Sequence, residues 1–209
     1  MFYEIDKGHG LPLDPFKCLV VPRPIGWITT LNTKGIVNLA PYSYFNAVGD
    51  DPPTVMFSSS AGDGPDRRKD SWRNAEAIGE FVCNMAVWDL REDMNKTSDI
   101  VPSDVDEAAL AGLEMVPSRL VKPPRVKRSP VHLECRWLKT VMIRQRGDYG
   151  PGDNGVVIGQ VVAVHIDDRL IKNGRVDLHG VRPIARLGYA EYTVADTIFR
   201  MIPPWAGPE

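Results

Sequence analysis

Residues at a loop–helix junction and at a strand end have the chemistry to bind an anion. Lys69, Asp70 and Ser71 stand where the glycine- and charge-rich loop 61–70 gives way to a short predicted helix. The exposed amides and positive dipole of a helix N-terminus favour a phosphate, and a lysine and a hydroxyl would complete its site. Three hydroxyl donors end the strand before this loop: Ser58, Ser59 and Ser60. The alternative is that Lys-Asp-Ser only caps the helix.

An aromatic stretch, "NLAPYSYFNAV" at 38–48, follows a predicted hairpin and contains two tyrosines, a phenylalanine and a serine around Pro41. It is either a corner of the core, where the rings fill space, or a platform for a flat ligand with polar edges. Together with a phosphate site it suits a flat phosphorylated cofactor such as FMN, whose ring buries apolar faces while its edge atoms seek hydrogen bonds.

Several common catalytic constellations are absent from the sequence. The four histidines are far apart without ligand spacing, and HExxH does not occur. No GxSxG elbow, Walker P-loop or GxGxxG is present, which disfavours hydrolases and Rossmann dehydrogenases. Cys18, Cys83 and Cys135 are scattered, so we expect reduced thiols rather than a disulfide or zinc site; a nucleophilic cysteine stays open, although no local base is visible.

The elements that must position these residues are mostly strands. Runs at 26–32 and 35–41, joined by "NTKG", predict a hairpin, and further strands are expected at 54–60, 80–87, 131–145 and 155–168, with a last short one within 182–194. A helix at 71–78 places Trp72, Ala75 and Ile78 on one face, with Asp70 as N-cap and Gly79 as its stop. Residues 88–118 look helical, including a helix from Ser103 to Gly112. This pattern predicts a mainly β, antiparallel barrel with helical insertions.

Length and composition fit one domain over 1–209, with an N-terminal extension at 1–24 and a helical and basic insertion at 88–130. The basic, proline-rich "SRLVKPPRVKRSP" within it is either a solvated connector or a route for an anionic substrate. A net charge of −2 argues against a nucleic-acid or lipid-coating protein, and no apolar run is long enough to span a membrane. We therefore expect a cytoplasmic protein that binds neither nucleic acid nor membrane.

Four blocks in order carry a family resemblance: "RPIGWITTLNTKGIVNLAPYSYFNAVGDDPPTVMFSSS", "KDSWRNAEAIGEFVCNM", "VIGQVVAVHIDD" and "PIARLGYAEY". Spread over roughly 25–192, they resemble the flavin reductase-like family, whose members adopt an FMN-binding split β-barrel. The resemblance implies a homodimer with its cleft near the subunit interface, and hydride transfer from NAD(P)H to a flavin that then reduces an acceptor. The flavin supplies the reactive atoms, so no catalytic acid or base is expected.

The resemblance also assigns roles to residues. The isoalloxazine and ribityl chain would be lined by Thr29, Thr30, Asn38, Ala40, Pro41, Tyr42 and Ser43. The phosphate would be held by Ser58, Ser59, Ser60, Lys69, Asp70 and Ser71. Arg186 and Tyr192 would contribute from the same chain or a neighbour. A phosphate site at 69–71 suits FMN better than FAD.

One departure from the family pattern affects the electron donor. Many reductases of the family have Gly-Asp-His before the strand that here reads "VVIGQVV", and this chain has Gly152, Asp153 and Asn154. Asparagine forms hydrogen bonds but carries neither proton nor positive charge at neutral pH. Asn154 is thus a candidate nicotinamide-side contact in an NAD(P)H-dependent flavin reductase. The alternative is a non-catalytic FMN-binding or electron-shuttle protein that does not use NAD(P)H.

Overall fold

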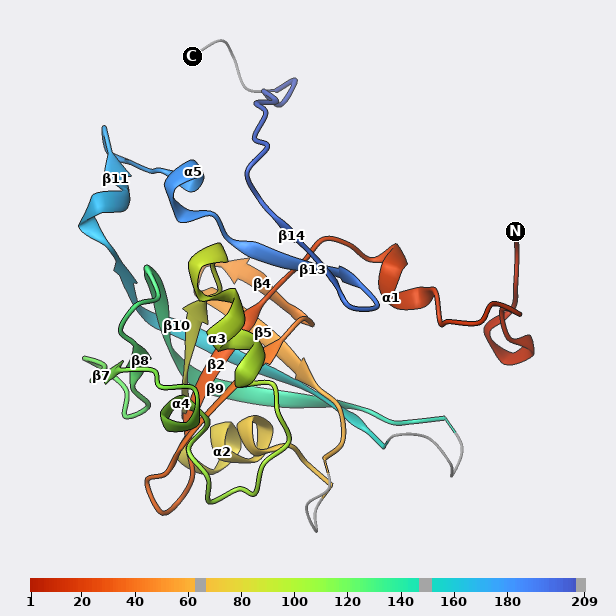
Figure 1. Ribbon diagram of the computed structural model, residues 1–209, viewed down its shortest axis with the longest axis horizontal. Coiled ribbons are helices and arrows are strands. Elements are labelled where there is room, and N and C mark those ends of the chain that lie inside the picture. Colours follow the sequence, from red (N-terminus) through yellow and green to blue (C-terminus); the bar gives the residue numbers. More distant parts are fainter. Residues whose placement is uncertain (63–66, 147–151, 206–209) are drawn as a thin grey trace.

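A computed structural model describes residues 1–62, 67–146 and 152–205, and one large antiparallel sheet dominates it (Figure 1). The sheet has seven strands in the order β3-β2-β6-β9-β10-β5-β4. Their bounds are β2 (Gly26–Leu31), β3 (Val37–Tyr42), β4 (Phe45–Asp50), β5 (Pro53–Ser59), β6 (Glu80–Met85), β9 (Val131–Ile143) and β10 (Asn154–Ile166). The predicted antiparallel split-barrel class is confirmed.

One strand was missed by the sequence analysis. We expected the chain to leave the sheet after Pro41 as an aromatic loop, but it turns within two residues and re-enters the sheet as β4. The turn residues are Ser43 and Tyr44, and Phe45 already pairs with Phe57 of β5. Strand β4 is exposed along most of its length, so its side chains lacked the alternation that predicts a half-buried strand.

The barrel interior is apolar, and helix α2 (Asp70–Ile78) packs into it. The interior cluster contains Ile28, Tyr42, Val55, Phe57, Phe81, Cys83, Cys135 and Val157, joined by Trp72 and Ala75 of α2. Trp72 lies against β10, where a Cβ on Gly155 would stand 2.5 Å from its ring, so this close approach requires glycine. The predicted shared face of α2 is confirmed for Trp72 and Ala75, which are buried.

Helix α2 ends before Gly79, as predicted, but it does not begin with Asp70 as its N-cap. Gly79 adopts φ 77° and its amide donates to the Ala75 carbonyl, as a C-terminal stop requires. The N-cap position is Lys69, whereas Asp70 is the first helical residue and pairs with Arg73 instead of capping. The prediction of Asp70 as N-cap was therefore wrong by one position.

The insertion forms a second core on the other face of the sheet. It contains η2 (Trp88–Leu90), α3 (Arg91–Lys96), α4 (Glu107–Leu110), β7 (Met115–Val116) and β8 (Arg125–Val126). Leu90, Met94, Ala108 and Val126 bury Trp27 and Leu39 there. The indole Nε1 of Trp27 donates to Thr97 Oγ1 at 2.8 Å. Figure 1 shows α3 and α4 lying over the sheet.

Most of the insertion is not helical, contrary to expectation for 88–118. The helix expected from Ser103 begins at Glu107, because Asp106 is the N-cap and its carboxylate accepts from the Ala109 amide at 3.0 Å. It ends before Gly112, whose φ is 70°. Proline and several polar residues between 97 and 106 leave too few apolar side chains at helical spacing to bury a continuous helix.

Buried polar side chains fix the basic, proline-rich segment onto the barrel wall. Glu134 is fully buried, and its carboxylate accepts from the amides of Arg119 at 2.8 Å and Leu120 at 2.6 Å, and from His165 Nε2 at 2.5 Å. His132, also buried, contacts the Val126 carbonyl through Nε2 at 2.8 Å. The backbone of this segment is thus anchored to the barrel at Arg119, Leu120 and Val126.

The remaining elements surround the barrel. A three-stranded sheet contains β1 (Arg23–Pro24), β13 (Ile184–Gly188) and β14 (Glu191–Val194), where we expected one short strand. Short elements complete the chain: η1 (Ile5–Lys7), α1 (Phe16–Leu19), η3 (Asp168–Leu170), β11 (Ile171–Lys172), β12 (Arg175–Val176) and α5 (Leu178–Val181). The segments before α1 and after β14, up to residue 205, extend away from the body (Figure 1). Within the described ranges, no helix has the length and apolar character to cross a membrane.

Candidate functional site

Four of the predicted site residues meet in one buried hydrogen-bond network. Asn38 on β3 donates from Nδ2 to Ser71 Oγ on α2 at 2.8 Å. The hydroxyls of Ser71 and Ser59 lie near the Tyr42 hydroxyl and lower its pKa, but burial outweighs them, so the pKa of Tyr42 is raised. Asn38, Tyr42, Ser59 and Ser71 are thus brought together from three elements. The network fixes the start of α2 against the β3 edge of the barrel.

The rings of the aromatic stretch divide between core and surface. Tyr42 packs 5.0 Å from the ring of Phe57 inside the barrel, and Phe45 fills the space left by Gly26, whose Cβ would meet its ring at 2.5 Å. These two rings match the core-corner alternative. Tyr44 is 38% exposed and is the ring of this stretch available to a ligand.

Thr29 and Thr30 lie on opposite faces of β2, since successive residues of a strand alternate. Thr29 Oγ1 accepts from Asn84 Nδ2 at 2.8 Å on the insertion side, and Thr30 Oγ1 accepts from Asn74 Nδ2 of α2 at 3.2 Å. Both threonines are fully buried. Their side chains hold neighbouring elements in place and are not brought together.

The edge of β3 leaves polar backbone beside the network. Strand β3 pairs only with β2, so its far side is unpaired in the sheet. Ala40, Pro41 and Ser43 are half-buried there. Pro41 suits an edge strand because its missing N–H costs no ladder hydrogen bond. The Leu39 amide on this side donates to Glu107 Oε2 at 3.0 Å.

A second group of polar residues lies at the outer ends of β5 and β10. Ser59 pairs with Gly155, so Ser60 lies across from Asn154. Ser58 and Ser60 are half-buried and lie on the face opposite the buried Ser59. Residues 63–66, from the loop expected at 61–70, and residues 147–151, from the turn expected before 155, fall outside the described residues.

Cations gather beside these serines. A Cβ on Gly152 would stand 2.3 Å from the Ala61 Cβ and 3.3 Å from Arg67 Nη2, so Ala61 and Arg67 lie next to Gly152, two residues before β10. Lys69 is exposed at the N-cap of α2. The carboxylate of Asp70 is paired with Arg73, which reduces its repulsion of an anion at this corner.

Arg186 and Tyr192 lie apart from this corner, on the three-stranded sheet. They are direct register partners of β13 and β14, with the guanidinium 4.5 Å from the ring centre and bonded to the tyrosine hydroxyl. Arg23, the β1 partner of Arg186, stacks 5.6 Å from the Tyr44 ring. The small sheet therefore adjoins the exposed ring of the aromatic stretch without reaching the network around Ser71.

The sequence analysis missed Arg67, Asn74 and Asn84. Arg67 lies in the loop that we described only as glycine- and charge-rich. Its φ of 54° and its contact with Gly152 are evident only in the three-dimensional structure. Asn74 and Asn84 are polar residues inside a buried helix face and a buried strand. Such positions signal hydrogen-bonded partners, because unpaired buried amides are costly.

The fold and these residues match a known family. The family described as "Flavin reductase like domain" matches residues 18–188. The chain belongs to this family. An uncharacterised protein from Aquifex aeolicus is 38% identical over 178 residues, which cover 85% of this chain and 86% of the relative.

Solved structures agree. Nitrilotriacetate monooxygenase component B from Bacillus cereus is 30% identical, with a TM-score of 0.81 over 93% of this chain and all of that one. The 2-nitrobenzoate 2-nitroreductase NbaA from Pseudomonas fluorescens is 28% identical, with a TM-score of 0.77 over 92% and 91% of the two chains. Family membership supports a flavin-linked oxidoreductase activity and a flavin cofactor.

Proposed function

We propose that the chain binds FMN at the β3 edge and the adjoining α2 corner and reduces it with NAD(P)H. The observation that carries the proposal is the joining of Asn38, Tyr42 and Ser71 in one network next to the cations of the 67–69 segment. This donor set fits the cofactor, because a phosphate requires cations and hydroxyls while a ring edge requires backbone polar groups. We infer FMN rather than FAD because the donors suit a terminal phosphate.

In this proposal the described residues bind and orient. Lys69, Arg67 and the outward hydroxyls of Ser58 and Ser60 hold the phosphate at the corner. The edge backbone from Ala40 to Ser43 contacts the ring edge, and Tyr44 shields one side from water. Thr29, Thr30 and Ser71 act through the elements that they fix, because their hydroxyls already have partners inside the protein.

The nicotinamide side of the proposal rests on Asn154. When bound, the flavin supplies a two-electron acceptor for hydride. Asn154, half-buried at the start of β10, offers an amide to the nicotinamide. The second candidate is an electron shuttle that holds FMN without using NAD(P)H, and the asparagine in place of the family's histidine favours it.

An anaerobic spectrum separates the two functions. We expect the purified chain to show bound-flavin bands with FMN and to lose them within minutes of adding NADH or NADPH. We expect Asn154→His to accelerate bleaching about tenfold, because a histidine cation adds an electrostatic contact to the dinucleotide. Persistent bands in both proteins would exclude the reductase and leave the shuttle, and no bound-flavin bands at all would exclude both.

We also propose a homodimer in the cytoplasm, the compartment that suits its three free cysteines. Both termini carry exposed apolar side chains, among them Phe2, Phe199 and Trp205, which are 87%, 77% and 86% exposed. Met142 and Ile143 on the outer part of β9 are also about half exposed. Apolar surface of this kind is stabilised by burial against another chain.

Light scattering of the eluting protein tests the dimer. We expect a mass of twice the 23.2 kDa chain, because burial against a second chain would remove the exposed apolar side chains of the arms from water. Phe199→Ser with Met201→Ser should shift the mass toward one chain, whereas Leu110→Ser, which changes an exposed leucine of the insertion, should not. A single-chain mass for the unmodified protein would contradict the proposal.

A further inference from the structure

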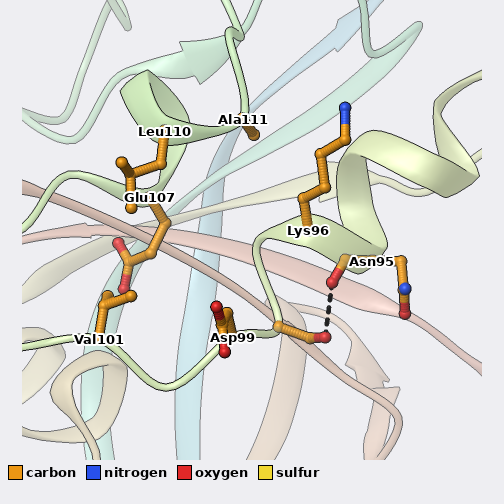
Figure 2. A pocket seen from close by; sticks show the side chains of 8 residues that line it. Asn95, Lys96, Asp99, Val101, Glu107, Leu110 and Ala111 are labelled. Carbon is orange, nitrogen blue, oxygen red and sulfur yellow. Dashed lines mark hydrogen bonds between the residues drawn. The ribbon is translucent and has the colours of Figure 1, made fainter.

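A cavity in the insertion lies outside the proposed flavin site. It has a volume of about 430 Å³, within the range of small-molecule sites. The lining residues come from the end of α3, the following loop and α4: Asn95, Lys96, Ser98, Asp99, Val101, Glu107, Leu110 and Ala111 (Figure 2). None of them belongs to the residues assigned to FMN.

A buried carboxylate without a cation faces this cavity. Glu107 is only 8% exposed, yet its carboxylate accepts hydrogen bonds from two neutral donors, the amides of Leu39 and of Glu107 itself. Among the described residues it forms no ion pair. Burial raises the pKa of Glu107, because these bonds do not compensate fully for lost hydration. A buried carboxylate without a counter-charge is stabilised by a cationic partner.

The lysine of the cavity does not supply that partner. Lys96 Nζ pairs with Asp93 Oδ1 at 3.3 Å, and Figure 2 shows its ammonium directed away from Glu107. Asp99 adds a second carboxylate, which accepts a hydrogen bond from the Ile100 amide at 2.9 Å. With Lys96 at +1 and with Asp99 and Glu107 at −1 each when ionised, the cavity lining has a net charge of −1.

An apolar wall lies beside these carboxylates. Leu110 is 67% exposed although it lines the cavity, and Val101 and Ala111 complete this wall (Figure 2). A ligand complementary to the whole cavity carries a cation at one end and a short hydrocarbon body.

We propose that this cavity binds a small aliphatic amine, with its ammonium paired to Glu107 and Asp99 and its hydrocarbon chain against Leu110, Val101 and Ala111. The lining fits a cation better than an anion or a neutral alcohol of the same size. The site is independent of the proposed flavin chemistry, since it requires neither FMN nor NAD(P)H.

Calorimetry and ligand-observed NMR with the purified chain test the site. The probes are n-butylamine and 1,4-diaminobutane, with n-butanol and butyrate as size-matched neutral and anionic controls. We expect saturable one-site binding of the amines, with the diamine tighter, and no binding of the controls. Equal binding of butylamine and butanol, or no binding of either amine, would overturn the proposal.

Variants locate the binding. We expect Glu107→Gln, which keeps an acceptor for the Leu39 amide, to weaken diamine binding at least tenfold, and Asp99→Asn to weaken it several-fold. Glu114→Gln removes an exposed carboxylate that pairs with Lys127 at 2.7 Å and should leave binding unchanged. Unchanged binding in Asp99→Asn and in a folded Glu107→Gln would place the amine elsewhere; if Glu107→Gln does not fold, Asp99→Asn decides alone.

Discussion

Replacing Lys69 and Arg67 together with alanine will weaken FMN binding about 100-fold and leave riboflavin binding nearly unchanged. Charge-assisted hydrogen bonds contribute about 1.5–3 kcal/mol each, and the exposure of both cations reduces this to about 1.4 kcal/mol each. Two such losses amount to about two factors of ten in the dissociation constant. Riboflavin lacks the phosphate, so the comparison isolates that group from the ring.

Fluorescence titration of both flavins measures this effect, because flavin emission changes when the ring is buried. Lys34→Ala with Arg175→Ala is the matched control, since it removes two exposed cations outside the 58–71 corner. Unchanged FMN binding in the Lys69 and Arg67 variant would show that the phosphate lies elsewhere. An equal loss for riboflavin would show that the variant disturbs the ring site.

Lowering the pH from 7.5 to 5 will destabilise the fold through His132 by about 2 kcal/mol. Burial lowers the pKa of His132 to about 4, below its ordinary value of 6.5, and its Nδ1 is buried without a hydrogen-bond partner among the residues that the structure describes. Protonation would place an unpaired N–H and a charge inside the barrel wall. The unfolded chain therefore binds more protons between about pH 6.5 and 4, and stability is lost as the pH falls through that window.

Urea unfolding at pH 7.5, 6.5 and 5 measures the free energy of unfolding. His132→Gln keeps a donor for the Val126 carbonyl, and we expect its loss of stability on acidification to be about 2 kcal/mol smaller than that of the parent. His179→Gln is the control, because His179 is exposed. Equal pH dependence in the parent and His132→Gln would contradict this role.

Glu134 acts in the same direction as His132. Burial alone would raise the pKa of Glu134, but hydrogen bonds from Arg119, His165 and Leu120 outweigh it and lower the pKa. Stability from this carboxylate is present above its unfolded pKa and lost as the pH falls through its folded pKa. Glu134 contributes equally in the parent and in His132→Gln. The difference between the two proteins in unfolding free energy lost on acidification therefore reports on His132 alone.

Much of the fold could be predicted from local patterns. The β-prone run at 54–60 predicted strand β5, and the spacing of Trp72 and Ala75 predicted the buried face of α2. The failures came where local signals were weak. Strand β4 is exposed, so its sequence lacks the alternation of apolar and polar residues that predicts a strand. Helix α4 is shorter than expected because the residues before it include few apolar side chains that could be buried.

Only part of the candidate site could be predicted from the sequence. The sequence identified Asn38, Tyr42 and Ser71, and the structure brings them together, but it could not show that the Ser71 hydroxyl is directed into a network. The placement of both Thr29 and Thr30 against one ligand overlooked strand alternation, which the sequence itself already specified.

The sequence by itself determined the family, the strand and helix periods, the stop at Gly79 and the hydroxyl and cation types near the start of α2. Tertiary structure alone decided which polar groups meet. Trp27 meets Thr97 and Leu39 meets Glu107 across about 70 residues, and Arg67 reaches Gly152 across a still longer separation. Periods and caps arise from neighbours along the chain, whereas such contacts depend on how the sheet closes and where the insertion packs.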